Sequence, residues 1–306
     1  MSPLTLTTAI CTHNPNLDIL RKAINSISDQ VDLPSDFELL IVDNCSKESI
    51  PKTIIPDNLK SRFRIVIEAN LGISHARLRA FKEAKSELLL FVDDDNILAK
   101  NYIRESLEIA KEFPHLGAWG AGIIEPIYEQ TPSPDLLPYV HMLAIFKTNT
   151  PMWSNLPWSS ISMPVTAGMM IREICWLKHI SNIEENPKRL LLGEKGGDLM
   201  RAEDTDIALS VIDSGYGHGT FPSLSILHYI PKERVTTQYL SRLKEGSTYS
   251  KLLLKHLRGI QTNAKMPPIQ RVKFWLKYLK SSPIEKKLRI ATRSGYAKYS
   301  TFLSNN

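Results

Sequence analysis

Three consecutive aspartates, Asp93, Asp94 and Asp95, follow a run of apolar residues in the stretch LLLFVDDDN. Like charges at this spacing repel one another unless a positive group neutralises them. Carboxylates with little nitrogen or sulfur nearby suit Mg²⁺ or Mn²⁺, and Mg²⁺ usually shares its site with substrate phosphates. The stretch therefore predicts a divalent metal site. Because Asp and Asn also favour turns and helix caps, the alternative is that the aspartates cap a helix over Asn96–Ala110.

A second acidic pair, Glu203 and Asp204, stands at the start of the stretch EDTDIALSVIDSGYG. The apolar residues of this stretch recur as they do on one face of a helix that ends near Gly215. Acids at the start of a helix are stabilised by the helix dipole, which is a purely structural role. A carboxylate can also accept a proton from a reacting hydroxyl. The residue types alone leave both roles open.

Strand and helix patterns alternate over the first hundred residues. Apolar runs predict strands at residues 4–11, 37–43, 64–70 and 88–94, and helical spacing predicts helices at 17–28 and 74–85. Such strands form a parallel sheet with helices on both faces, and ligands bind beyond the carboxyl ends of the strands. Thr12, Asp43 and Asn70 follow strand ends, as the three aspartates do. We therefore expect these side chains to converge at one edge of the sheet.

The composition is that of a globular chain of 306 residues, of which 42% are hydrophobic. Its three cysteines, Cys11, Cys45 and Cys175, are too far apart for a local metal knuckle, and we expect reduced core residues in a cytoplasmic protein. The N-terminal residues lack the basic flank and apolar stretch of a signal peptide. No apolar run approaches the roughly 18 residues of a membrane span. We expect neither secretion nor a membrane-spanning segment.

The net charge of +6 is unevenly distributed along the chain. From Lys251 onward, thirteen Lys and Arg residues stand against one acid, Glu285, whereas the first 250 residues hold 25 basic and 31 acidic residues. A basic tail on an acidic body predicts contact with a polyanionic surface.

Within this tail, the stretch PPIQRVKFWLKYLK predicts a basic amphipathic helix. Its apolar face comprises Ile269, Val272, Trp275, Leu276 and Leu279, and Lys and Arg residues flank that face. Such a helix can lie in the interface of an anionic membrane. The alternative is that the apolar face packs back on the rest of the chain. Nucleic acid is not an expected partner, because no base-reading motif accompanies the charge.

Seven motifs occur in an order that resembles the family 2 glycosyltransferases, which are inverting enzymes with the GT-A fold. They are AICTHN, LLIVDNCS, NLGISHARLRAF, LLLFVDDDN, TAGMMIRE, AEDTDIALSVIDSGY and ILHYIPKER. The resemblance covers residues 4–245 and implies an α/β fold with a Rossmann-like, mostly parallel central sheet. It implies a catalytic domain over residues 1–245, with a nucleotide-binding half at 1–100 and an acceptor-binding half at 101–245. Residues 246–306 are then a basic helical extension.

The resemblance also implies roles for individual residues. The nucleotide-sugar is expected to contact Thr12, Asn14, Asp43, Asn70, Gly72, Arg77, Asp94, Gly168 and Arg234. A Mn²⁺ or Mg²⁺ ion is expected to bind Asp93, Asp95 and His228, and the three adjacent acids leave open which two of them face the metal. Asp204 is implied as the general base, with Glu203 beside it. Several positions depart from the usual pattern. In one of them, VDNCS stands where V-D-D-G-S is more common.

The function implied is transfer of one sugar from a nucleotide-sugar, expected to be a UDP-sugar, to a glycan or lipid-linked glycan. Processive relatives carry a Q-x-x-R-W motif, for which the nearest stretch, QYLSRL, is a poor match. A sugar nucleotidyltransferase should carry a glycine-rich, basic loop after the first strand, where this chain has THNPNLD. A non-catalytic glycan-binding or nucleotide-sugar-binding relative should lack the acids, which this chain has. Both alternatives are therefore less favoured.

Overall fold

The structure is a computed structural model that describes residues 4–159, 161–263 and 268–305. The chain divides into two compact units. The sheet unit comprises residues 1–127, 145–185 and 204–229, and the helical unit comprises residues 128–144, 186–203 and 230–306. The predicted boundary after residue 245 falls inside one helix, α6 (Thr237–Leu257). The helical unit therefore begins earlier than the predicted extension and includes two segments from the middle of the chain.

One mixed sheet forms the centre of the sheet unit. Its strands lie side by side in the order β3-β2-β1-β4-β9-β6-β12-β5. Two short strands, β7 and β8, pair with β6 and β12. The strands are β1 (Leu4–Thr12), β2 (Phe37–Asn44), β3 (Phe63–Glu68), β4 (Ser86–Phe91), β5 (Asn96–Leu98), β6 (Leu116–Tyr128), β7 (Phe146–Lys147), β8 (Met152–Ser154), β9 (Met170–Arg172) and β12 (Gly217–Ile230).

The first four strands are parallel, as their continuous apolar runs predict. β1 pairs with β2 and β4, and β2 pairs with β3. Thr12 lies opposite Asp43 in the register of β1 and β2. The carboxyl ends of these strands therefore meet at one edge. β9, β5 and β8 join in antiparallel pairs, which the sequence patterns did not indicate.

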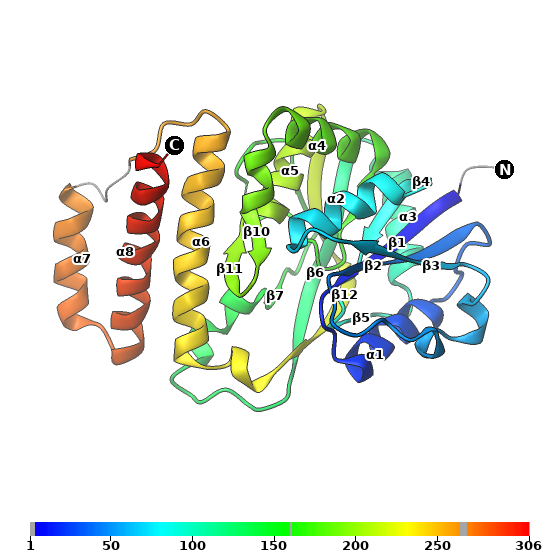
Figure 1. Ribbon diagram of the computed structural model, residues 1–306, viewed down its shortest axis with the longest axis horizontal. Helices are drawn as coiled ribbons and strands as arrows, with labels where there is room; N and C mark the ends of the chain where they lie inside the picture. The colour runs from blue at the N-terminus through cyan, green and yellow to red at the C-terminus, as the bar shows by residue number, and fades with distance from the viewer. Residues whose placement is uncertain (1–3, 160, 264–267, 306) are drawn as a thin grey trace. The chain divides into compact units, whose positions relative to one another are not determined.

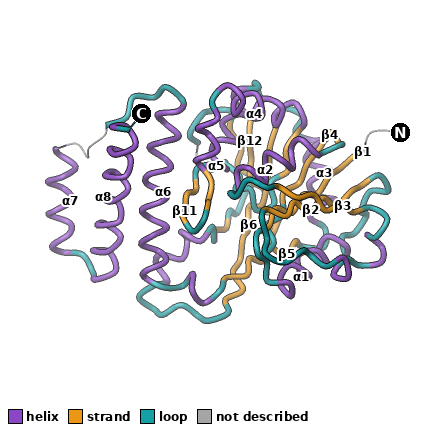
Figure 2. The backbone as a smooth tube through the Cα atoms, viewed as in Figure 1, coloured by secondary structure: helices purple, strands orange, loops and turns teal. Residues whose placement is uncertain are grey.

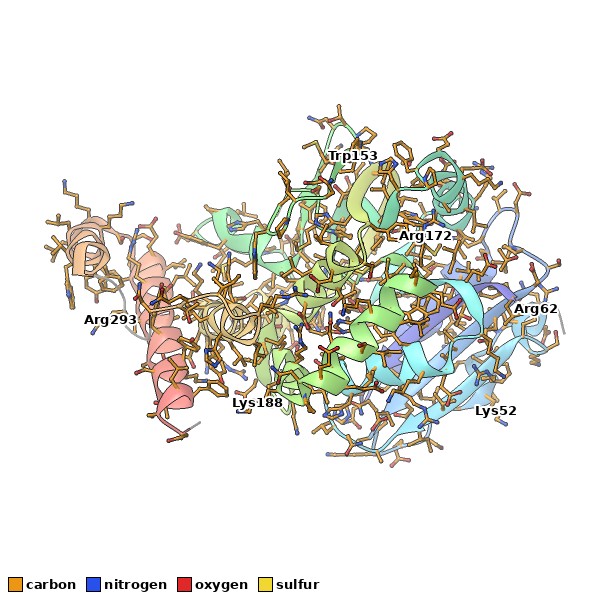
Figure 3. All side chains as sticks on the ribbon, turned by 90° about the horizontal axis from the view of Figure 1, so that it is seen from above. Lys52, Arg62, Trp153, Arg172, Lys188 and Arg293 are labelled. Atoms are coloured by element: carbon orange, nitrogen blue, oxygen red, sulfur yellow. The ribbon has the colours of Figure 1, made fainter. Side chains whose placement is uncertain are left out.

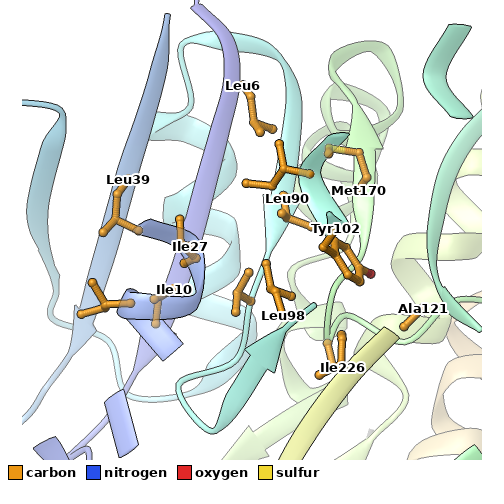
Figure 4. Packing of buried hydrophobic residues seen from close by; sticks show 14 of the residues in the cluster. Leu6, Ile10, Ile27, Leu39, Leu90, Leu98, Tyr102, Ala121, Met170 and Ile226 are labelled. Carbon is orange, nitrogen blue, oxygen red and sulfur yellow. The ribbon is translucent and has the colours of Figure 1, made fainter. Parts of the chain in front are cut away.

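Helices cover both faces of this sheet, as predicted (Figure 1). They are α1 (Leu17–Ser28), α2 (Ile73–Glu83), α3 (Tyr102–Glu112), α4 (Glu173–Glu185) and α5 (Glu203–Asp213), with the short 3-10 helices η1 (Lys52–Ile54) and η2 (Asp57–Leu59). One core lies between the sheet and helices α1 and α3, where Tyr102 lies beside Leu90 and Ile27 lies beside Ile10 (Figure 4). The other core includes Phe81 of α2 and Trp176 of α4, whose rings stack at 6.2 Å.

If the three aspartates capped a helix, that helix would have to begin at Asn96, but the helix of this region begins later. Asn96–Leu98 is β5, which pairs with β12, and α3 begins at Tyr102. Asp93–Asp95 therefore do not cap α3. Residues 96–98 form a strand and not a helix start because they pair with β12, and this contact between residues distant in sequence overrides the local preference of Asn and Asp for a helix cap.

The helical unit contains three long helices and a small hairpin. These elements are α6, α7 (Pro268–Lys280), α8 (Pro283–Ser304), β10 (Gly193–Lys195) and β11 (Asp198–Arg201), with the 3-10 helices η3 (Leu137–Leu143), η4 (Pro187–Leu192) and η5 (Lys232–Arg234). Helix α8 lies between α6 and α7 (Figures 1 and 2). Across the described residues, no helix has the length and apolar content needed to cross a membrane.

Candidate functional site

The loops that follow β1 and β2 are joined by hydrogen bonds at the sheet edge. The amide of Asn14 donates to Ser46 Oγ at 2.8 Å, and the amide of Lys47 donates to Asn14 Oδ1 at 2.8 Å. Asp43 Oδ1 accepts from the amide of Ser46 at 3.1 Å. Asn14 and Asp43 therefore lie in one network through Ser46, and Thr12 lies opposite Asp43 in the register of β1 and β2. Contact of these three residues with a nucleotide stays a prediction.

Asn44, which was not among the predicted site residues, links this network to the loop before α2. Its buried side chain accepts from the amide of Gly72 at 2.8 Å. The same side chain donates to the carbonyls of Asn70 at 2.7 Å and of Glu68 at 3.1 Å. Asn44, whose only signal in the sequence was its place directly after a predicted strand, thus holds the backbone of Asn70 and Gly72. Contact of these two residues with a nucleotide-sugar stays a prediction.

Cys45 occupies the position where the family pattern usually has glycine. Its φ is +59°, in the left-handed region that favours glycine. Its thiol lies 3.3 Å from the carbonyl oxygen of Glu68 and 3.1 Å from that of Ala69. These contacts help to hold the unfavourable backbone conformation. All three cysteines are free thiols, and Cys11 and Cys175 are buried as expected. Cys45 was also expected in the core, but it is only half-buried.

Two of the three adjacent aspartates have partners from other strands or helices. Thr12 donates a hydrogen bond to the carboxylate of Asp94. Arg77, on α2, forms an ion pair with Asp93 at 3.1 Å. The Arg77 side chain is only 9% exposed, so a buried cation offsets part of the negative charge. The predicted residues Thr12, Arg77, Asp93 and Asp94 are therefore brought together.

The third aspartate, Asp95, lies beside His228. The imidazole Nε2 is 3.5 Å from Asp95 Oδ2, and both side chains are largely buried. The antiparallel register of β12 and β5 sets this pair, since His228 lies opposite Asn96 and the amide of Tyr229 donates to the carbonyl of Asp95 at 2.8 Å. The pairing of β12 with β5 therefore brings together two residues that lie more than a hundred positions apart and that the family resemblance implies as metal ligands.

Asp95 and His228 fit part of a divalent metal site, because a carboxylate oxygen and an imidazole nitrogen are both ligands of Mn²⁺. Asp93 faces Arg77 instead. In the ranges 4–159, 161–263 and 268–305, no three His, Cys, Asp or Glu side chains are gathered as a complete metal cage. Donor sets in which substrate phosphates and waters complete the shell are common for Mg²⁺. The residues fit a site that is completed by such groups.

Gly168 lies in a turn beside the end of β4, where its amide donates to the carbonyl of Phe91 at 2.9 Å. Its φ is +77°, and a Cβ atom there would lie 2.4 Å from both Ile226 and the hydroxyl of Tyr102. That hydroxyl donates to the Gly168 carbonyl at 2.6 Å. Packing and backbone conformation therefore explain this glycine, and its contact with a nucleotide-sugar stays a prediction.

The acidic pair lies in the first turn of α5, as predicted. Asp204 Oδ1 accepts from the amide of Thr205 at 2.7 Å, and Glu203 is buried. Glu203 and Arg234 belong to the helical unit, whereas Asp204 and the other predicted residues belong to the sheet unit. Asp204 thus has the position expected of a helix-start acid, and its role as a base stays a prediction.

In sequence and in fold, the chain is similar to known glycosyltransferases. The model of the family described as glycosyl transferase family 2 matches residues 7–173. An uncharacterized glycosyltransferase of Haemophilus influenzae (strain ATCC 51907 / DSM 11121 / KW20 / Rd) is 30% identical over 90 residues, which are 27% of this chain and 27% of that protein. The chain therefore matches only about a quarter of that curated relative.

Among solved structures, S. aureus TarS resembles this chain with a TM-score of 0.50 and 15% identity, covering 95% of this chain and 55% of TarS. A structure of TarS 1–349 in complex with UDP-GlcNAc has a TM-score of 0.47 and 14% identity, covering 99% of this chain and 92% of that one. The first likeness shows a shared fold, which confirms the predicted GT-A architecture.

The Asn44 network yields a test of how the sheet edge is held. Asn44→Ala removes three hydrogen bonds and leaves buried backbone groups without them, so we expect the free energy of unfolding to fall by about 1–3 kcal/mol. Asn58→Ala is the matched control, because that exposed asparagine bonds only Ser28. Urea unfolding measures both variants. Equal losses would show that Asn44 has no special structural role.

Proposed function

Because the chain belongs to glycosyl transferase family 2, we propose that it transfers a hexosyl residue from a UDP-sugar to a glycan or lipid-linked glycan. Transfer occurs with inversion, and one sugar is added at a time. The observation that carries this proposal is the meeting of β1, α2 and β12 at Asp93–Asp95, where Thr12, Arg77 and His228 approach the three carboxylates. A nucleotide-sugar needs such a polar edge for its base, ribose and diphosphate.

The diphosphate end of the donor would be held near Asp95 and His228. A Mn²⁺ or Mg²⁺ ion bound there would neutralise the negative charge that develops on the leaving nucleoside diphosphate. Arg77 holds Asp93 in place through its ion pair. Thr12 orients Asp94 by its hydrogen bond. These two contacts fix the orientation of both carboxylates next to Asp95.

Asp204 would accept the proton of the acceptor hydroxyl. The hydrogen bond from the amide of Thr205 fixes the orientation of this carboxylate. An inverting displacement requires the base and the leaving group on opposite faces of the sugar. Glu203 is proposed beside the base, and Arg234 is proposed to reach the diphosphate. A binding-only relative or a sugar nucleotidyltransferase is the less favoured alternative, because the chain keeps both sets of acids and lacks a glycine-rich loop after β1.

We also propose that the enzyme works at the cytoplasmic face of an anionic membrane, through α7. Four apolar side chains at helical spacing are exposed on this helix, namely Val272 (61%), Trp275 (51%), Leu276 (62%) and Leu279 (74%). The alternative that this face packs back on the chain therefore does not hold for these four residues. Ile269 is also predicted to lie on this face, but its side chain is not among those that the structure describes.

The opposite side of α7 is anchored on α8. Phe274 is buried, and the guanidinium of Arg293, which is labelled in Figure 3, lies 5.6 Å from the centroid of its ring. The same guanidinium lies 5.3 Å from the ring centroid of Trp275, so this half-exposed side chain of the apolar face also contacts α8. Lys277 and Lys280 are exposed beside the apolar face. An apolar stripe with a tryptophan and flanking lysines is the pattern of a helix that lies in a membrane interface. Each nearby Lys adds about 1 kcal/mol of attraction to anionic lipid.

The metal proposal is tested at the aspartates. In Asp95→Ala we expect Mn²⁺ affinity, measured by titration calorimetry, to fall, and transfer to fall by about 10²- to 10³-fold, as when a group that stabilises developing charge is removed. Chelation should abolish transfer by the parent chain. Asp57→Ala is the control, because that exposed aspartate pairs only with Lys60 at the surface. Unchanged Mn²⁺ affinity in Asp95→Ala together with full transfer in excess chelator would reject the metal.

The base proposal is tested by Asp204→Asn, which preserves size and most capping ability. We expect donor affinity to persist while transfer falls by the roughly 10²- to 10⁴-fold that loss of a general base causes. Asp213→Asn, at the other end of α5, is the control. A comparable loss of donor affinity in Asp204→Asn would instead indicate a structural role, and near-normal transfer would reject the assignment.

The membrane proposal is tested by flotation with vesicles containing phosphatidylserine. The full chain should bind at low salt, and Lys277→Gln/Lys280→Gln should bind roughly 30-fold more weakly, because two lysines contribute about 1 kcal/mol each. Trp275→Gln/Leu276→Gln/Leu279→Gln should not float. Leu177→Gln is the control, since Leu177 is an exposed helical leucine on α4 (53%). Equal flotation of all variants would exclude α7 as the anchor, and a dimer lost in the triple variant would assign the face to a second copy.

A further inference from the structure

The helical unit contains a cavity of about 600 Å³ that none of the predicted donor-site residues lines. Its walls are the β10–β11 hairpin, α6 and α8. A volume of this size lies in the range of small-molecule sites, which are usually preformed and carry a few well-placed polar groups. The cavity therefore requires an account of its own.

Close backbone contacts fix the walls of this cavity. A Cβ atom at Gly246 of α6 would lie 2.1 Å from the carbonyl oxygen of Leu199 in β11. A Cβ atom at Gly295 of α8 would lie 2.7 Å from the side chain of Thr248 in α6. Both glycines allow main chains to approach more closely than any other residue would permit. The three walls are thus held by the backbone, which makes the cavity preformed.

The hairpin brings a carboxylate to the cavity rim. Gly196 and Gly197 have φ values of +58° and +88°, as a two-residue hairpin turn requires. The guanidinium of Arg242 donates to the carbonyl of Gly197 at 2.6 Å, which fastens the turn to α6. Asp198 follows directly and is exposed. Its position is therefore set by the turn and by Arg242.

The charges that line the cavity are balanced. Asp198 and Glu245 supply two negative charges, and Arg242 and Lys298 supply two positive ones. Lys298 Nζ lies 2.6 Å from Glu245 Oε1. Although burial opposes its ionisation, hydrogen bonds from Lys298 and Ser294 hold the pKa of Glu245 below its usual value. A phosphate or nucleotide site would need an excess of positive charge, so a neutral ligand fits better.

The remaining lining groups are suited to hydroxyl groups and to an apolar sugar face. Tyr249 and Phe302 provide aromatic rings, and Thr301 and Asn305 provide a hydroxyl and an amide. Burial raises the pKa of the Tyr249 phenol, so it stays neutral and can both donate and accept. The ion pair uses one of the three donors of the lysine ammonium, which leaves donor capacity toward the cavity.

We infer that this cavity binds a neutral sugar unit of a glycan. Aromatic rings would pack on the C–H face of the sugar, and the carboxylates, amide and ammonium would bond its hydroxyls. None of the residues proposed to bind the donor lines this cavity. Binding there requires no donor and no transfer.

Saturation-transfer NMR with the full chain tests this inference. The probes are glucose, galactose, N-acetylglucosamine and their disaccharides, with glucose 6-phosphate and inorganic phosphate as charged counterparts. We expect at least one neutral sugar to bind. Asp198→Asn should weaken that binding by about tenfold, the equivalent of one lost hydrogen bond to a charged group. This residue is exposed, so the variant should fold normally, as a thermal melt will show.

Tyr249→Phe and Tyr249→Ala separate the role of the Tyr249 hydroxyl from the role of its aromatic ring. The Phe variant keeps the ring and should retain most binding, whereas the Ala variant should lose it. Asp135→Asn, an exposed aspartate that does not line the cavity, is the control. Binding of phosphate compounds alone, absence of binding by every neutral probe, or equal binding by all variants would each overturn the inference. Since no probe is a nucleotide-sugar, these outcomes do not depend on the proposed transfer reaction.

Discussion

The mutual repulsion of three adjacent carboxylates is the constraint on which the sheet unit depends. Asp93, Asp94 and Asp95 follow a buried strand, where water screens charge less than at an open surface. Each carboxylate is approached by a different part of the fold, from α2, β1 and β12 respectively. The sheet order that brings β1 beside β4 and the register that brings β12 beside β5 are therefore both needed to hold this cluster together.

Uncharged side chains hold the loops at the same sheet edge, after β2 and before α2. Asn44 bonds the backbone of the loop before α2, and Asn14 bonds the backbone of the loop after β2. Side-chain amides can donate and accept at once, so one asparagine can satisfy several backbone groups that strands and helices leave open. A rigid polar edge of this kind can bind a polar ligand without being reorganised first, which limits the entropy lost on binding.

The helical unit combines two surfaces of different character. Glycines let β11, α6 and α8 approach closely around a polar, charge-balanced cavity. On α7, by contrast, apolar side chains are exposed beside lysines. The proposed sugar-binding cavity and the proposed membrane-facing helix lie in one unit, which would suit an acceptor that carries both a glycan and a lipid. The acidic first 250 residues would be repelled by the same anionic surface that is proposed to attract the tail.

The sequence by itself determined the parallel strands β1 to β4, the helices between them, the strand-end position of the aspartates and the apolar face of α7. These follow from local period and from residues adjacent in the chain. Only the tertiary structure decided that Asn96–Leu98 is a strand, that Asn44 organises the edge, that His228 lies beside Asp95, and that the helical unit takes segments from three parts of the chain. The physical reason is that antiparallel register and side-chain hydrogen bonds join residues far apart in sequence, and no local period encodes such pairings.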